Sequence, residues 1–121
     1  MSETHTLTTY DAIMNAITTN DGGGTKIHNP ATGELVGSYQ VHDNNDLNDA
    51  VAAARAAQPN WEAQGDHARC ELLNKFADAI EQAAEPLATL LSQEQGKPLN
   101  GPNARFEVGA CAAWLRATAS F

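Results

Sequence analysis

The pattern of apolar and polar residues changes twice along the 121-residue chain. Residues 1–25 mix Thr, Asn and Asp with a short periodic stretch at Tyr10–Ile17, and three consecutive glycines begin at Gly22. This composition predicts a loosely held leader with one or two helical turns, followed by a flexible joint. We therefore divide the chain after residue 25.

Residues 26–41 have the pattern of a β-hairpin. Residues 29–33 have the composition of a turn, and residues 35–41 are β-prone and partly alternating. Pro30 fixes its own φ, and Gly33 can adopt a positive φ. Two strands alone are marginal in water, so we expect the hairpin to lie on a larger body.

The pattern beyond His42 is helical, and it predicts about four helices over residues 45–121. Candidate N-caps, prolines and glycines mark the expected boundaries. The first helix starts near Asn44, Asn45 or Asp46 and ends before Pro59, Asp66 caps the second, Pro86 and Gly96 bound the third, and Pro102 opens the fourth. The last residue, Phe121, follows no helix stop, so we expect the sequence to be cut from a longer one.

Each predicted helix has an apolar stripe that should face the interior. In chain order the stripes are Leu47, Val51, Ala54 and Ala57 or Ala50; Cys70, Leu73, Phe76 or Ala77, Ile80 and Ala84; Leu87, Leu90 and Leu91; and Val108, Cys111, Ala112 and Leu115. Many of these residues are alanines, which favour helix but bury little area. The sequence therefore predicts a mainly α-helical fold with a thin interior that gains stability from packing against something else.

The formal net charge of −8 argues against a nucleic-acid partner, because phosphate binding needs clustered Lys and Arg and the seven basic residues are scattered. We interpret the acidic surface as a source of solubility. No stretch is apolar over the length that a bilayer requires. The first twenty residues also lack the basic and apolar segments of a secretory signal, so a cytoplasmic location is expected.

Few residues suggest chemistry of their own. Gly22-Gly23-Gly24-Thr25-Lys26 lacks the spacing of a phosphate loop and precedes a strand, so a linker is favoured. The sequence has no Gly-x-Gly-x-x-Gly fingerprint, no paired histidine spacing for zinc and no nucleophile elbow. Cys70 and Cys111 are expected to be small buried hydrophobes, with a disulfide or a reactive thiol as the lesser alternatives.

Three carboxylates, Glu81, Glu85 and Glu94, fall along the second and third helices. Carboxylates on helices normally form a solvated surface unless a partner is present. Glu94 differs in one respect, because Glu94 and Lys97 flank the helix stop at Gly96 and are therefore candidates for fixed orientations. From the residues alone, however, this segment is a helix C-cap, and no function follows.

Five phrases in sequence order resemble the start of the aldehyde dehydrogenase superfamily, over Ile27 to the end. They are Asn29-Pro30-Ala31-Thr32-Gly33-Glu34 with Leu35-Val36-Gly37; Ala50-Val51-Ala52-Ala53-Ala54-Arg55-Ala56-Ala57 with Pro59 and Trp61; Arg69, Leu72 and Leu73 with Ala77-Asp78; Glu94-Gln95-Gly96-Lys97-Pro98-Leu99; and Glu107-Val108 with Ala112-Ala113-Trp114-Leu115-Arg116. The fourth phrase and the last one are similar to those of members acting on semialdehydes or on aldehydes of central metabolism.

The resemblance implies an α/β family fold, of which residues 26–121 form the N-terminal part of a coenzyme-binding domain. It implies an enzyme that oxidises an aldehyde or semialdehyde to a carboxylate with NAD or NADP, through a cysteine thiolate and a glutamate base. Those groups and the cofactor loop lie beyond this sequence, so no catalytic or cofactor-binding residue is assigned here. Glu94 matches a position that helps to hold a structural cation in some members.

Three hypotheses follow from this resemblance. The chain is an inactive N-terminal portion of a dehydrogenase, or a structural subunit whose partner chain supplies the catalytic half, or a free-standing interaction module. In the first two cases the remainder of the fold is the partner, in cis or in trans, and the complete enzyme is expected to be a homo-oligomer. We expect no tight binding of NAD or NADP by this chain alone.

Overall fold

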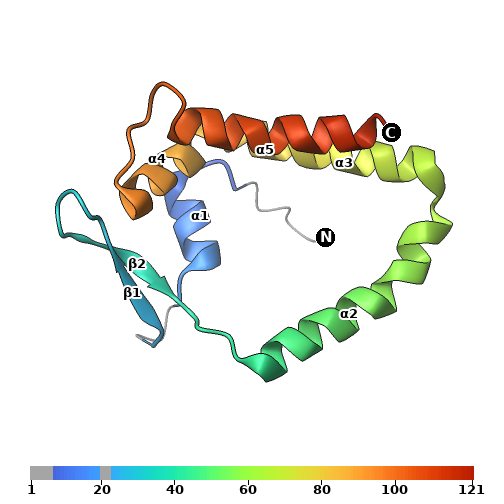
Figure 1. Ribbon diagram of the computed structural model, residues 1–121, viewed down its shortest axis with the longest axis horizontal. Helices are drawn as coiled ribbons and strands as arrows, with labels where there is room; N and C mark the ends of the chain where they lie inside the picture. Colours follow the sequence, from blue (N-terminus) through green and yellow to red (C-terminus); the bar gives the residue numbers. More distant parts are fainter. Residues whose placement is uncertain (1–6, 20–22) are drawn as a thin grey trace.

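The computed structural model describes residues 7–19 and 23–121. Helices dominate the described part (Figure 1). Its elements are α1 (Tyr10–Ile17), β1 (Thr25–His28), β2 (Leu35–Tyr39), α2 (Asn44–Ala63), α3 (Gly65–Gln82), α4 (Ala84–Gln95) and α5 (Ala104–Ala119). The predicted hairpin, the four helices that follow it and the mainly α-helical class are confirmed.

Helix α1 is a short helix that packs into the interior. The Thr9 Oγ1 accepts a hydrogen bond from the Ala12 N–H at 3.2 Å, which caps the helix. Ile13 is only 4% exposed and packs with Ala83 and Leu90. The helix has about two turns, the longer of the predicted lengths, and it packs more closely than the loosely held segment that was expected. Of the predicted glycine joint, Gly22 lies outside the described residues, whereas Gly23 and Gly24 are described and Gly24 has φ of 82°.

The hairpin pairs β1 with β2 in antiparallel register, with an irregularity between Ile27 and His28. The turn is closed by hydrogen bonds from the Asn29 N–H to the Glu34 carbonyl at 2.8 Å and from the Gly33 N–H to the Asn29 carbonyl at 2.7 Å. Gly33 has φ of 77°, as its place in the turn predicts. Val36 packs against the α1–α4 cluster, so the hairpin lies on a larger body, as expected.

Helix α2 is fully formed but has no buried residue. Its N-terminus has a reciprocal capping box, in which Asp43 accepts from the Asp46 N–H at 3.0 Å and Asp46 accepts from the Asp43 N–H at 2.8 Å. The prediction that the helix ends before Pro59 is wrong, because Pro59 lies inside it. A proline cannot donate to the carbonyl four residues earlier, but that carbonyl is on an exposed helix where water can satisfy it.

The corner between α2 and α3 differs from the predicted one. Gln64 is the N-cap of α3 and makes no side-chain capping bond, whereas Asp66 lies within the first turn. The positive φ of Gly65, 80°, makes the sharp change of direction. Arg69 then connects the two helices, because it pairs with Asp66 and donates to the Glu62 carbonyl at 3.0 Å.

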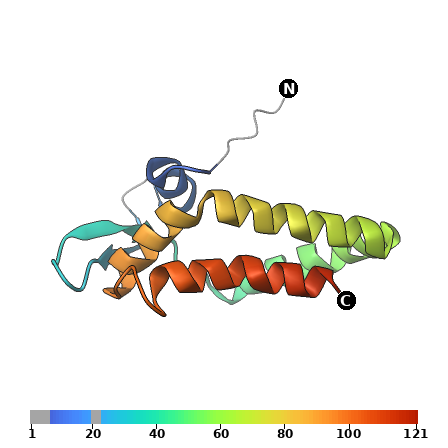
Figure 2. The same ribbon diagram turned by 90° about the horizontal axis from the view of Figure 1, so that it is seen from above.

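Helices α3 and α5 run side by side, and α4 packs against the start of α5 (Figure 2). The buried residues at these contacts are mostly small: Ala77, Ala88, Ala104, Val108 and Ala112. The thin, alanine-rich interior is therefore confirmed. Small side chains allow the helix backbones to approach closely, which explains how so few large groups form a core.

The stripes are partly as predicted. Of the alternatives in α3, Ala77 is buried and Phe76 is exposed. Cys111 was expected to face inward, but it is exposed because the inner face of α5 follows Ala104, Val108 and Ala112 at a strict spacing of four. Pro102 lies in the loop before α5, which begins at Ala104 rather than at the proline.

Candidate functional site

The end of α4 lies against the turn of the hairpin. Gly96 terminates α4 with φ of 65°, and its N–H donates to the Ser92 carbonyl at 2.8 Å. A Cβ on Gly96 would lie 2.6 Å from the Cγ of Pro30 in the hairpin turn. Glycine is therefore required here for its positive φ and for the close approach of Pro30. The helix stop and the turn, which are far apart in the sequence, form one contact.

Lys97 is held in place on the other side of this helix stop. Its Nζ donates to both carboxylate oxygens of Glu107 on α5, at 2.7 and 2.8 Å. The Ser92 Oγ donates to the Lys97 carbonyl at 2.7 Å, which fixes the backbone as well. Lys97 therefore has a fixed direction, and it ties the end of α4 to the first turns of α5.

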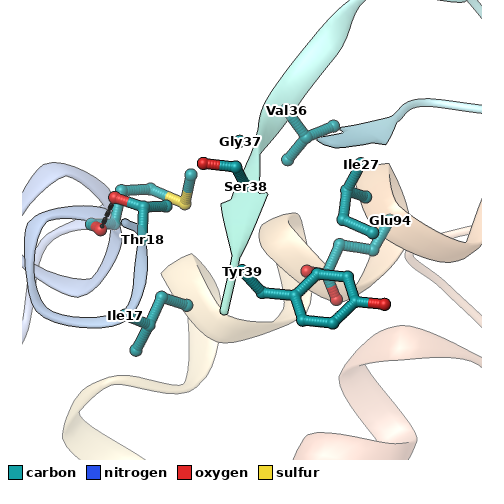
Figure 3. A pocket seen from close by; sticks show the side chains of 9 residues that line it. Ile17, Thr18, Ile27, Val36, Gly37, Ser38, Tyr39 and Glu94 are labelled. Atoms are coloured by element: carbon teal, nitrogen blue, oxygen red, sulfur yellow. Dashed lines mark hydrogen bonds between the residues drawn. The ribbon is translucent and has the colours of Figure 1, made fainter. Parts of the chain in front are cut away.

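Glu94 faces a small cavity between α1, the hairpin and α4 (Figure 3). The cavity measures about 40 Å³ and is lined by Met14, Ile17, Thr18, Ile27, Val36, Gly37, Ser38, Tyr39 and Glu94. A water molecule needs at least about 10–15 Å³, so this space is large enough for a water molecule or a bare cation. It is far below the roughly 300–1,000 Å³ of ligand pockets, so no dinucleotide fits inside it.

The residues around this cavity do not complete a cation site. Glu94 supplies one carboxylate, and no group of three or more Asp, Glu, His or Cys within residues 7–19 and 23–121 could hold a metal ion. The Thr18 Oγ1 donates to the Met14 carbonyl at 2.6 Å, and the Ser38 Oγ shares a 2.7 Å hydrogen bond with the Thr19 Oγ1. A hard cation needs about six oxygen ligands, and a single carboxylate supplies at most two of them. The assignment of Glu94 to a structural cation stays a prediction.

The fold changes the pKa of the Tyr10 phenol, which lies near Glu94. Its hydroxyl donates to the Gln93 Oε1 at 2.6 Å. Burial raises the pKa of the Tyr10 phenol, and the negative charges of Glu94 and Asp11 raise it further. The phenol therefore stays protonated and keeps its hydrogen bond to α4 over the physiological range.

Glu81 and Glu85 have partners that the sequence did not indicate. Arg116 on α5 donates to the Glu81 carboxylate at 2.6 and 3.2 Å and to Asp78 at 2.7 Å. Arg105, also on α5, pairs with Glu85 through two hydrogen bonds. The hydrogen bond from Arg105 holds the pKa of Glu85 below its ordinary value, and the Glu81 and Asp78 carboxylates raise the pKa of Arg116. These carboxylates are therefore cross-helix ties rather than a purely solvated face.

Neither cysteine is arranged as a nucleophile. The Cys111 Sγ donates to the carbonyl of Glu107, four residues earlier on its own helix, at 3.4 Å. Cys70 is half-buried, and both thiols are free. A thiolate nucleophile needs a base or a positive environment, and neither cysteine has an ion pair or a histidine partner within the part of the chain that the structure describes.

Within residues 7–19 and 23–121, no helix is long and apolar enough to cross a membrane.

The contact between Pro30 and Gly96 joins two of the sequence phrases that carried the resemblance, and comparison with known proteins agrees with it. A sequence profile described as "Aldehyde dehydrogenase family" matches residues 17–121. The chain belongs to the aldehyde dehydrogenase family. No solved structure matches the chain.

Several curated relatives in this family are dehydrogenases of semialdehydes or sugars. The chain is 41% identical over 90 residues to an aspartate-semialdehyde dehydrogenase (non-phosphorylating) of Halomonas elongata, covering 74% of the chain and 18% of that protein. It is 40% identical over 90 residues to a 3,6-anhydro-alpha-L-galactose dehydrogenase of Streptomyces coelicolor, with the same coverage. It is 44% identical over 72 residues to an N-succinylglutamate 5-semialdehyde dehydrogenase of Novosphingobium aromaticivorans, covering 60% of the chain and 15% of that protein. The chain thus spans less than a fifth of the length of these relatives.

The site residues that sequence reasoning missed are those that act across helices. Arg105 and Arg116 carry no local signal, because each pairs with residues on another helix. The Pro30–Gly96 contact was also missed, although each residue was identified separately as a turn or cap. A spacing pattern finds neighbours on one helix face, and it does not find partners that the tertiary fold supplies.

Proposed function

We propose that this chain is the N-terminal portion of an NAD(P)-dependent dehydrogenase that oxidises an aldehyde or semialdehyde to a carboxylate, and that it is inactive alone. Its role is structural: it contributes packed helices and a hairpin to a coenzyme-binding domain whose catalytic groups are supplied elsewhere. The observation that carries this proposal is the set of large apolar side chains left exposed in the chain. The names of the relatives support a semialdehyde substrate, and a cytoplasmic location fits soluble metabolic chemistry.

The exposed apolar residues gather mainly on α2 and on the outer faces of α3 and α5: Leu47, Val51, Trp61, Leu72, Phe76, Phe106 and Trp114. On α2, a shallow surface hollow is lined by Val51, Ala54, Arg55, Ala57, Gln58 and Trp61. An exposed apolar surface of this kind marks an interaction site. We propose that the remainder of the dehydrogenase fold covers this surface, because the Halomonas elongata relative is more than five times longer than the region that matches this chain.

A fragment-complementation experiment tests the proposal. The part of the Halomonas elongata relative that follows its matched region is co-expressed with this chain, and NAD(P)H formation is measured with aspartate semialdehyde and with N-succinylglutamate semialdehyde. We expect a soluble complex that reduces the nicotinamide, and no activity from either piece alone. Trp61→Ser should weaken assembly, whereas the control Lys26→Ser, at an exposed polar residue of the hairpin, should not.

The competing hypothesis is a free-standing interaction module, and the same preparation distinguishes it. An interaction module would be monomeric and would melt cooperatively on its own. It would not bind the complementary part of the Halomonas elongata relative. Calorimetric titration with NAD and NADP completes the test. We expect no tight binding by the chain alone, since the cavity beside Glu94 is far too small for a dinucleotide. A tight isotherm with either cofactor would overturn the structural role.

We also propose that Glu94 provides one ligand of a structural cation in the assembled enzyme, together with oxygens from the remainder. In the complementation complex, the activity or melting temperature should depend on the monovalent or divalent cation present. Glu94→Gln should remove that dependence while the complex still assembles. If the variant retains the same cation dependence, Glu94 is not a ligand.

A further inference from the structure

The loop between α4 and α5 contains the one Asn-Gly pair of the sequence, Asn100-Gly101. Both residues are exposed, and they lie outside helices and strands. Gly101 has φ of 72°, and a Cβ at this position would first meet the Asn103 Nδ2 at 3.4 Å. Because glycine has no side chain, its backbone nitrogen is the least hindered nucleophile that can follow an asparagine.

The surroundings of this pair favour attack on the asparagine side chain. The Oδ1 of Asn100 accepts a hydrogen bond from the Arg105 guanidinium. A positive donor at a carbonyl oxygen draws charge from the carbon and stabilises the negative oxygen that forms when a nucleophile adds. Within residues 7–19 and 23–121, the Gly101 N–H donates no hydrogen bond, so no acceptor holds the attacking nitrogen.

We propose that Asn100 is a site of spontaneous deamidation. Hydroxide removes the proton of the Gly101 N–H, and this nitrogen forms a bond to the Cγ of Asn100. The bond between Cγ and the side-chain nitrogen then breaks, and ammonia leaves with a proton taken from water. Water adds to either carbonyl of the resulting succinimide, which gives isoaspartate or aspartate. One water molecule is consumed and one ammonia is released, with no change in oxidation state.

The modification changes how the chain enters α5. The loop carbonyls of Pro98 and Leu99 accept hydrogen bonds from the first N–H groups of α5, Ala104 at 3.2 Å and Arg105 at 3.1 Å. Isoaspartate adds a methylene to the backbone two residues after Pro98, which displaces these carbonyls. Either product also places a new carboxylate beside Arg105, where it competes with the existing partner of this guanidinium, Glu85.

Mass spectrometry of the full chain after incubation at mildly alkaline pH tests the proposal. Trypsin does not cut after Lys97, because Pro98 follows, so a single peptide of residues 76–105 contains both Asn100 and Asn103. We expect Asn100 to be converted to isoaspartate and aspartate while Asn103, in the same peptide, stays intact. If Asn100 stays intact, or is converted no faster than Asn103, the proposal is wrong.

Two comparisons separate the effect of the fold from that of the sequence. Arg105→Gln should slow the conversion of Asn100, as should unfolding the chain in concentrated urea, because both remove the guanidinium from the Oδ1. Faster conversion in urea would mean that the fold protects Asn100, and it would overturn the inference. Asn100→Gln retains a side-chain amide but forms a larger ring slowly, so the modification should be lost with the melting temperature of fresh protein unchanged.

Discussion

Helices α2 and α4 both have apolar side chains, but α4 is packed among other elements whereas α2 is exposed to solvent. The shorter α4 buries Ala88 completely and leaves Leu90 only 6% exposed, and it contacts α1, α3 and α5. The longer α2 has a capping box and an apolar stripe, yet Leu47 is 61% exposed and no residue of the helix is buried. Local signals are sufficient to form both helices, whereas burial requires a partner element. In this chain, α4 packs against three helices, whereas the contact of α2 with α3 at their corner buries no residue of α2.

The largest expected effect comes from truncating the same residue type in the two helices. Leu90→Ala should lower the free energy of unfolding by about 2–3 kcal/mol, because it opens a void between α1 and α4. Leu47→Ala on α2 should change it by less than about 0.5 kcal/mol, since the side chain is already in water. Urea unfolding of the full chain measures both. Equal losses for the two variants would mean that α2 has a partner in solution, which would contradict the comparison.

A second pair of substitutions examines the contact that fixes the end of α4. Gly96→Ala should cost about 2–3 kcal/mol, because it combines a left-handed backbone with a clash against Pro30. Gly33→Ala has a similar positive φ but meets nothing within 4 Å, so it should cost only about 1 kcal/mol. The difference between the two melting curves isolates the Pro30 contact. Identical losses would show that the hairpin does not rest on α4.

A third prediction concerns the pH dependence of the two helices. Hydrogen bonds from the Asp46 and Asn45 N–H groups lower the pKa of Asp43 at the start of α2, and the hydrogen bond from Arg105 lowers the pKa of Glu85 on α4. A carboxyl group whose pKa is lowered by folding stabilises the folded state when the pH is above the ordinary pKa of that group. This stabilisation is lost as the pH falls through the lowered pKa. Unfolding should therefore become easier as the pH falls through about 4.5 and below. Asp43→Asn and Glu85→Gln should each flatten this dependence, as followed by circular dichroism; an unchanged pH profile in both would contradict the assignment.

The smallest expected effect is at Tyr10, where α1 meets α4. The Glu94 carboxylate contributes to the raised pKa of the phenol, although burial contributes more. Glu94→Gln should therefore shift the Tyr10 titration partly toward its ordinary value. Ultraviolet difference absorbance over the alkaline range measures the shift. A Tyr10 titration identical in both proteins would place the Glu94 carboxylate farther from the phenol than the structure does.

The sequence was sufficient for features whose cause is local. The turn at residues 29–33 and the left-handed cap at Gly96 follow from the φ preferences of proline and glycine, and both were predicted. The end of α2 was not predicted correctly. A proline usually breaks a buried helix, but Pro59 is tolerated in α2 because water reaches the carbonyl that lacks a hydrogen bond. Choosing Ala77 over Phe76 as the buried residue of α3 likewise required knowledge of α5, which approaches closely enough to exclude a large ring.

The candidate site was predicted less completely, for the same reason. Gly96 and Lys97 were identified as parts of a helix stop, but the partner of Lys97 is Glu107 on another helix. The partners of Glu81 and Glu85 are also on α5, and no spacing rule connects them. Family membership came from short phrases in a fixed order, which depend on the sequence itself and need no knowledge of contacts.

The contact of Pro30 with Gly96 also affects the order in which the chain acquires structure during synthesis. Ribosomes release the N-terminal segment first, so α1 and the hairpin emerge before α3 and α4 exist. Two strands and two helical turns are marginal alone, and the groups that support them, Leu90 and Gly96, are made much later. The N-terminal third must therefore wait, without stable tertiary structure, until α4 is complete. A nascent chain stalled before residue 84 should remain open to proteases at the hairpin.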